Sequence, residues 1–195
     1  MWGQTREPDH VVVVADNCTD ATADIARQHG AEVFHTHNNV HKKAGALNQA
    51  IEWALPHLAD RDLILVQDAD TILNPRFVET AIGTFNRQVG AVGGVFYGEK
   101  GGGLLGLLQR MEFHRYAWEI ERTGGKAQVL TGTGTMFRAR VLREVRDARR
   151  SGRLGGGTEC AGEPPRLRLD TSDQALLLPA VHDGLRRLWA SWSIR

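Results

Sequence analysis

The chain has 195 residues, of which 42% are hydrophobic and 24% charged, so it is long enough to bury the core of one globular domain over 1–195. A formal net charge of +1 argues against a nucleic-acid partner, and no apolar run reaches the roughly 18 residues of a membrane-spanning helix. The first ten residues lack the apolar region of a secretory signal. Two distant cysteines, Cys18 and Cys160, form no disulfide framework and fit a reducing cytoplasm.

The first part of the chain alternates apolar runs with helical patterns. The β-branched run HVVVVA at 10–15 predicts a strand buried on both faces. A short helix is expected over 21–29, and a second strand over 32–36. Apolar residues then recur at helical spacing from about Lys43 until Pro56 ends the segment.

The following segments continue the alternation. The run DLILVQ at 62–67 predicts another buried strand, and Asn74-Pro75 predicts the start of a helix that reaches about Arg87. A strand is expected over 91–97 and a long helix over 104–122. Core packing is the preferred explanation for the apolar stripe of that helix, and contact with a bilayer surface is the alternative.

A further helix is expected over 137–145. Strands that alternate with helices through short connections indicate an α/β fold with a mainly parallel sheet and right-handed crossovers. Ligands bind such sheets at the carboxyl ends of the strands. Asp16 and the pair Asp68 and Asp70 follow two of the predicted strands, so all three carboxylates are expected at that edge.

The triplet Asp68-Ala69-Asp70 is the clearest candidate site. Two carboxylates one residue apart at a strand end offer hard oxygen ligands to Mg²⁺ or Mn²⁺, with nucleotide phosphates completing the shell. An acidic turn without a ligand would have the same sequence. Histidines 35, 37 and 41 crowd one loop, but their spacing matches no common zinc site.

Two further residues allow two interpretations each. Asp16 ends its strand where a carboxylate can accept a hydrogen bond from a nucleobase, although the run Asp-Asn-x-Thr-Asp equally suits a turn and helix cap. Lys43 lies at the head of a predicted helix, where a cation and free amides favour a phosphate. A solvated lysine is the alternative.

Six sequence blocks, taken together and in order, resemble the family-2 glycosyltransferase domain, and the similarity covers about 4–140. They are VVVVADNCTDAT, HKKAGALNQAI, LILVQDADTILNPRFVE, GAVGGVFYG, LLQRMEFHRY and VLTGTGTMFR. The blocks are most similar to the membrane-bound synthases of β-linked polysaccharides, of the cellulose, hyaluronan and poly-N-acetylglucosamine types.

The resemblance implies a Rossmann-like GT-A fold, a nucleotide-sugar donor, usually UDP-linked, and a saccharide or lipid-linked acceptor. It implies that Asp16 recognises the base, that Lys43 lies near the diphosphate, and that Asp68 and Asp70 hold the metal, Asp68 also binding the nucleotide. Thr133 and Gly134 match a loop that lines the acceptor. Relatives lie at the cytoplasmic face of the membrane, which implies peripheral membrane contact for a cytoplasmic chain.

The chain departs from the family pattern at both ends. A first strand expected before the present start is missing from the sequence, and 141–195 forms a divergent, Arg/Gly-rich carboxyl region. In place of the family's T-E-D motif the chain has Thr171-Ser172-Asp173, so Asp173 is the candidate general base, with Asp170 as a chemically equal neighbour.

Two alternatives to a working glycosyltransferase remain. The departures at the ends allow an inactive remnant of such an enzyme. Asp68-Ala69-Asp70-Thr71 also fits the opening motif of haloacid-dehalogenase-like phosphatases, in which Asp68 is a nucleophile and Asp70 an acid/base. Those enzymes need a later acidic pair at a strand end, and the sequence offers none that is convincing.

Overall fold

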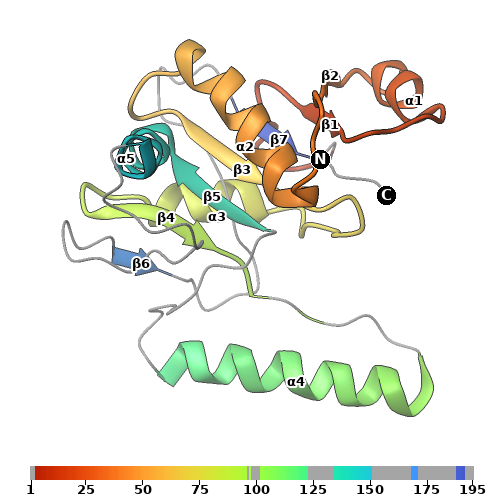
Figure 1. The fold of residues 1–195 in the computed structure, drawn as a ribbon. Coiled ribbons are helices and arrows are strands. Elements are labelled where there is room, and N and C mark those ends of the chain that lie inside the picture. Colours follow the sequence, from red (N-terminus) through yellow and green to blue (C-terminus); the bar gives the residue numbers. More distant parts are fainter. Residues whose placement is uncertain are drawn as a thin grey trace.

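The computed structural model describes residues 3–95, 97, 102–122 and 134–150, and the backbone of 168–170 and 188–191. Figure 1 shows the arrangement of the elements. In chain order they are β1 (Val12–Ala15), α1 (Thr22–Gln28), β2 (Glu32–His35), α2 (Lys42–Ala54), the 3₁₀ turn η1 (Leu55–His57), β3 (Leu63–Val66), α3 (Phe77–Thr84), β4 (Val89–Gly93), α4 (Gly103–Arg122), β5 (Thr135–Arg138), α5 (Ala139–Arg150), β6 (Arg168–Asp170) and β7 (Leu188–Ser191).

The strands form two sheets that meet at β7. In the first sheet β1 pairs with β2 in parallel, and in the second the order is β6-β4-β5-β3-β7. Strand β5 runs antiparallel to both of its neighbours, whereas β3 with β7 and β4 with β6 pair in parallel. Strand β7 also contacts β1. Three of the five pairings between described strands are therefore parallel, and the predicted α/β, Rossmann-like fold class is confirmed.

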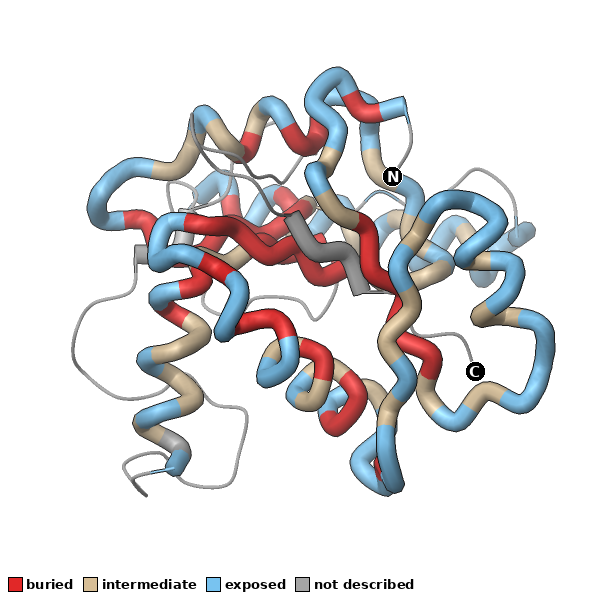
Figure 2. Tube along the Cα trace, turned by 90° about the horizontal axis from the view of Figure 1, so that it is seen from above, coloured by how far each residue is buried: buried red, intermediate tan, exposed pale blue. Residues whose placement is uncertain are grey.

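Strand β3 shows how the core forms on both faces of the sheet. Leu63 and Leu65 pack with α3 and β4, while Ile64 and Val66 pack with η1 and the start of α5. This alternation follows from the period of two in a strand, and every residue of β3 is buried. The central strands are accordingly the most buried part of the chain in Figure 2. The sheet thus has helices on each face, as the continuous apolar runs predicted.

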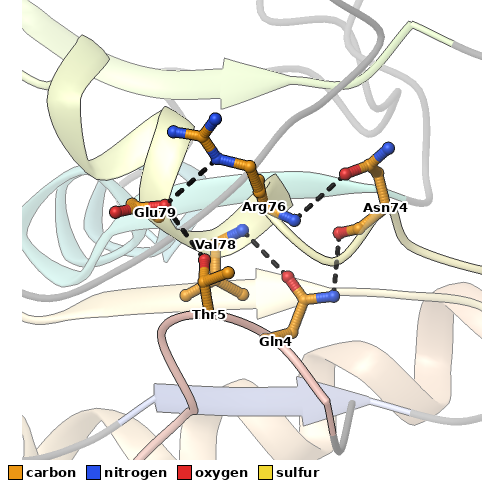
Figure 3. Close-up of polar contacts among 6 residues, drawn as sticks. All are labelled: Gln4, Thr5, Asn74, Arg76, Val78 and Glu79. Carbon is orange, nitrogen blue, oxygen red and sulfur yellow. Dashed lines mark hydrogen bonds and ion pairs between the residues drawn. The ribbon is translucent and has the colours of Figure 1, made fainter.

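The segment before β1 is anchored to the start of α3 (Figure 3). The Gln4 side chain is 8% exposed, and its amide donates to the Asn74 carbonyl at 2.9 Å. Its Oε1 accepts from the Val78 backbone amide at 3.1 Å. Because the first amides of a helix have no partner within the helix, Gln4 caps α3 from a distant part of the sequence.

Two expectations about elements need correction. The predicted helix over 137–145 begins only at Ala139, because Phe137 and Arg138 belong to β5. The strand expected over 91–97 covers Val89–Gly93 instead.

Helix α4 has the predicted length, but core packing, the preferred explanation of its apolar stripe, is wrong for the first part of the helix. Leu104, Leu108 and Met111 are 74%, 54% and 60% exposed, and only Ala117 and Ile120 are buried in this helix. Figure 1 shows α4 running apart from the described strands, on the side away from α2. No helix among the described residues is both long enough and apolar enough to cross a membrane.

Candidate functional site

The Asp16 carboxylate lies just beyond the carboxyl end of β1 and is held by the segment that follows β2. Its Oδ1 accepts from the Thr36 hydroxyl at 2.7 Å and from the Asn39 side-chain amide at 2.8 Å. The Asn17 side chain approaches the same oxygen at 3.4 Å. Parallel pairing of β1 with β2 places these residues side by side, since Ala15 lies opposite His35. Asp16 is therefore a fixed acceptor, more constrained than a solvated turn requires.

Asn39 joins the end of β1 to the start of α2. Its Nδ2 donates to Lys42 O at 2.8 Å as well as to Asp16, and its Oδ1 accepts from the His41 amide at 3.0 Å. The Asn39 carbonyl accepts from Asn17 Nδ2 at 3.0 Å. The residue is 8% exposed, and each group of its side-chain amide is bonded. The base-recognition candidate and the first turn of α2 are thus held by one side chain.

The surrounding loop is strained and clamped. Asn17, Asn38 and Lys42 all have positive φ, at 53°, 47° and 50°. Asparagine tolerates this conformation, but lysine rarely adopts it, and such strain persists only where neighbouring contacts enforce it. The Gln49 side chain of α2 supplies part of that enforcement, because it accepts from the His37 amide at 2.8 Å and donates to the His37 carbonyl at 3.0 Å.

Lys43 and Asp68 form an ion pair between the first turn of α2 and the residues after β3. Their side chains are 36% and 29% exposed, so the pair remains accessible to a ligand. Two hydrogen bonds close the turn that carries Asp68: the Thr71 amide donates to the Asp68 carbonyl at 3.2 Å, and Gln67 Nε2 donates to the Thr71 carbonyl at 2.6 Å. Asp70 lies exposed in the same turn.

Gly134 precedes β5 and lies at the edge of the sheet where β3 ends. Val66 lies opposite Thr135, so Gly134 is next to the point at which the chain leaves β3 for Asp68. Its φ is 60°, and its carbonyl accepts from the Gly94 amide at 2.8 Å. Thr133 and Asp173, predicted to line the acceptor and to act as general base, lie outside the described residues.

The donor atoms at this edge suit a hard divalent cation. Asp68 and Asp70 offer only carboxylate oxygens, which Mg²⁺ and Mn²⁺ prefer over nitrogen or sulfur. Over the part of the chain that the structure describes, no group of three or more His, Cys, Asp or Glu side chains comes together as a metal site. A cation held by Asp68 and Asp70 would therefore need phosphate oxygens or water to complete its shell.

The site alternates negative and positive groups. Asp16 is at one end, the amino end of α2 with Lys43 lies in the middle, and Asp68 and Asp70 lie at the other end. The amides of the first turn of α2 have no side-chain cap, so they add partial positive charge beside Lys43.

Asp20 lies between Asp16 and the start of α1. Hydrogen bonds from the side chain and the backbone amide of Thr22 lower the pKa of the Asp20 carboxyl.

Sequence reasoning missed Thr36, Asn39 and Gly45. Gly45 is buried in the first turn of α2, where a Cβ atom would lie 2.0 Å from Asn39 Oδ1. The only signal was the run Asn38-Asn39 between a strand and a helix, which suits turns in general. The hydrogen bond between Asn39 and Asp16 joins residues that are more than 20 positions apart in the sequence, so no local pattern reveals it.

Comparison with known proteins supplies the family. The model of the glycosyltransferase-like family 2 matches residues 3–164, which is most of the chain and includes Asp16, Lys43, Asp68 and Asp70. Searches of curated proteins and of solved structures gave no match. The matched range contains the parallel strands β1 and β2, the helices α1 and α2 that follow them, and the turn after β3. The chain therefore belongs to the glycosyltransferase-like family 2.

Proposed function

We propose that the chain is an inverting glycosyltransferase that moves a sugar from a UDP-linked donor to a saccharide or lipid-linked acceptor. Family membership supports glycosyl transfer in general. The observation that supports this donor most strongly is the Lys43–Asp68 ion pair, because it joins a helix amino end to an acidic turn at one edge of the sheet. A diphosphate with a divalent cation matches that pattern of charge.

Each residue then has a role in binding the donor. The Asp16 carboxylate accepts an N–H of the base, while Lys43 and the first amides of α2 face the diphosphate. Asp68 and Asp70 would hold Mg²⁺ or Mn²⁺, which would neutralise charge on the departing diphosphate. In the structure Lys43 forms an ion pair with Asp68. We infer that Lys43 turns from Asp68 to the phosphates when the donor binds.

The transfer step needs a base and an acceptor. Asp173 removes the proton of an acceptor hydroxyl, whose oxygen attacks the anomeric carbon as the bond from that carbon to the diphosphate breaks. Attack from the opposite side inverts the configuration. The acceptor approaches over Thr133 and Gly134. By the resemblance noted above, we take this acceptor to be a growing β-linked polysaccharide.

A transfer assay tests this function. UDP release from a panel of UDP-hexoses, with oligosaccharide acceptors and Mn²⁺, is expected for the unmodified chain. Asp173→Asn is expected to lower the rate by about 10²–10⁴-fold, because a general base contributes that much, while binding of UDP is retained. Asp170→Asn is the matched control, with a change below about tenfold. Greater loss in the control would assign the base to Asp170, and a folded chain without transfer would be an inactive member.

We also propose that α4 rests on a lipid surface. Its first nine residues include Leu104, Leu105, Leu107, Leu108 and Met111, which are 46–76% exposed. No charge occurs from 101 to 109. These side chains expose on the order of 500 Å², below the roughly 800 Å² per partner of a stable protein interface. A bilayer needs no such complementary area, and it accepts an apolar helix face that lies in its interface.

Vesicle flotation tests this contact. The chain is expected to float with phosphatidylcholine vesicles, and added anionic lipid is expected to change this little because residues 101–109 carry no charge. Leu104→Gln/Leu108→Gln is expected to reduce flotation at least tenfold. Ile25→Gln replaces an apolar residue of α1 that is 52% exposed, and it is expected to have no effect. The lipid contact would be contradicted if the unmodified chain does not float and instead forms a dimer that the double substitution converts to a monomer.

A further inference from the structure

The two oxygens of the Asp16 carboxylate have unequal surroundings. Oδ1 accepts from Thr36 at 2.7 Å and from Asn39 at 2.8 Å, and Asn17 approaches it at 3.4 Å. A carboxylate oxygen has about two lone-pair sites, so Oδ1 has no capacity left for a ligand. Among the described residues no donor lies on Oδ2. Asp16 is partly exposed, so Oδ2 is the oxygen that remains available to a ligand.

The donors on Oδ1 cannot easily turn away. Asn39 is 8% exposed, and the orientation of its amide is fixed by the His41 amide on one side and the Lys42 carbonyl on the other. The Thr36 backbone amide also donates to the Ala15 carbonyl at 3.2 Å, which holds Thr36 beside the end of β1. The unequal use of the two oxygens is therefore built into the chain before any ligand arrives.

We propose that Thr36 and Asn39 determine nucleobase specificity by leaving Asp16 a single acceptor oxygen. Guanine presents two adjacent donors, the ring N–H and the exocyclic amino group, which together match both oxygens of a carboxylate. Uracil presents one ring N–H between two carbonyl oxygens, which matches one oxygen and would be repelled by a second. A carboxylate with one free oxygen thus selects the uracil type of base over guanine. This inference rests on the proposed nucleotide site.

The preference for uracil depends on weaker binding of guanine as well as on the hydrogen bond that uracil makes with Asp16. Guanine would lose its second hydrogen bond to Asp16, because Thr36 and Asn39 already occupy Oδ1. A buried donor left without an acceptor weakens binding more than the mean strength of a hydrogen bond suggests. Thr36 and Asn39 are thus specificity-determining residues that need not touch the base themselves. Asn39 is also a positioning residue, because it fixes Asp16 relative to the turn that carries Lys43.

Calorimetric titration of UDP and GDP, both with Mn²⁺, tests this inference. The unmodified chain is expected to bind UDP at least tenfold more tightly than GDP. Thr36→Val keeps the shape of the side chain and frees a lone pair on Oδ1, so the ratio of the two affinities is expected to narrow by about tenfold, mainly through tighter GDP binding. Asn39→Ala is expected to weaken UDP binding as well, because Asp16 loses its position.

Gln49→Ala is the matched control, because Gln49 holds the same loop through His37 without touching Asp16. It is expected to leave the ratio of UDP to GDP affinity unchanged. If the unmodified chain binds UDP and Thr36→Val keeps the same ratio, the inference is wrong while the proposed function stands. Equal binding of GDP and UDP by the unmodified chain also overturns it. A folded chain that binds neither nucleotide overturns the nucleotide site and the inference together.

Discussion

Gly45→Ala is expected to lower the free energy of unfolding by about 3 kcal/mol and to abolish UDP binding. A Cβ at this position would lie 2.0 Å from Asn39 Oδ1 and 2.8 Å from His41 Cβ. Overpacking of a buried site costs about 1–3 kcal/mol, and each hydrogen bond of Asn39 that is lost adds about 1 kcal/mol. The start of α2 would have to move, and Asp16 and Lys43 would no longer be held together.

Gly83→Ala is the matched control for this substitution. Gly83 lies in α3, and a Cβ there would meet nothing within 4 Å. Alanine favours a helix over glycine by up to about 1 kcal/mol, so this variant is expected to be equally stable or slightly more stable. Urea denaturation measures the free energy of unfolding of both variants. Equal stability of the two variants would show that Asn39 moves aside freely, and it would contradict the account of a rigid loop.

Lys43→Gln is expected to weaken UDP binding in Mn²⁺ by at least tenfold. The substitution removes the cation that lies between the acidic turn and the amino end of α2. It also removes the ion pair between Lys43 and Asp68. A tenfold change corresponds to about 1.4 kcal/mol, a modest value for a cation that faces a diphosphate in a partly exposed site.

Lys42→Gln provides the comparison for Lys43, because it changes the same charge one residue earlier. Lys42 is exposed in the unmodified chain, where its backbone φ is 50°. UDP affinity is expected to stay within about twofold of that of the unmodified chain. If both substitutions weaken binding equally, the effect belongs to the overall charge of the loop, and Lys43 has no specific role.

The elements with the clearest sequence signals were also the ones predicted correctly. The runs at 10–15 and 62–67 contain β1 and β3, because continuous burial on both faces requires apolar residues at every position. Helix α2 followed from apolar spacing and from Pro56. The sequence also indicated that Asp16 and Asp68 follow strands, and the structure places both at carboxyl ends.

Other features depend on contacts that no local pattern contains. The residues Phe137 and Arg138 were expected in a helix, but β5 pairs them with β3 and β4, so tertiary pairing overrides local preference. The leucines of α4 have the spacing of a buried stripe, yet they are exposed, because periodicity shows which residues share a face and not what covers that face.

In the candidate site, too, some residues could be predicted from local sequence and others depend on tertiary contacts. Residue type and position indicated Asp16, Lys43, Asp68 and Asp70, and the structure brings Lys43 and Asp68 into contact. The two donors on Asp16 Oδ1 could not be predicted, because Thr36 and Asn39 reach it from the next strand and loop. Asp70 is exposed in the turn after β3, and its part in metal binding remains a prediction, as does the role of Asp173.

The most direct test of the central claim is calorimetric titration of UDP with and without Mn²⁺, in the unmodified chain and in Asp70→Asn. Asp9→Asn, an exposed acidic residue before β1, controls for the change in charge. The account predicts binding that requires Mn²⁺, is kept in Asp9→Asn and is lost in Asp70→Asn while the fold remains intact. Binding of equal strength without metal, or undiminished in Asp70→Asn, would contradict it.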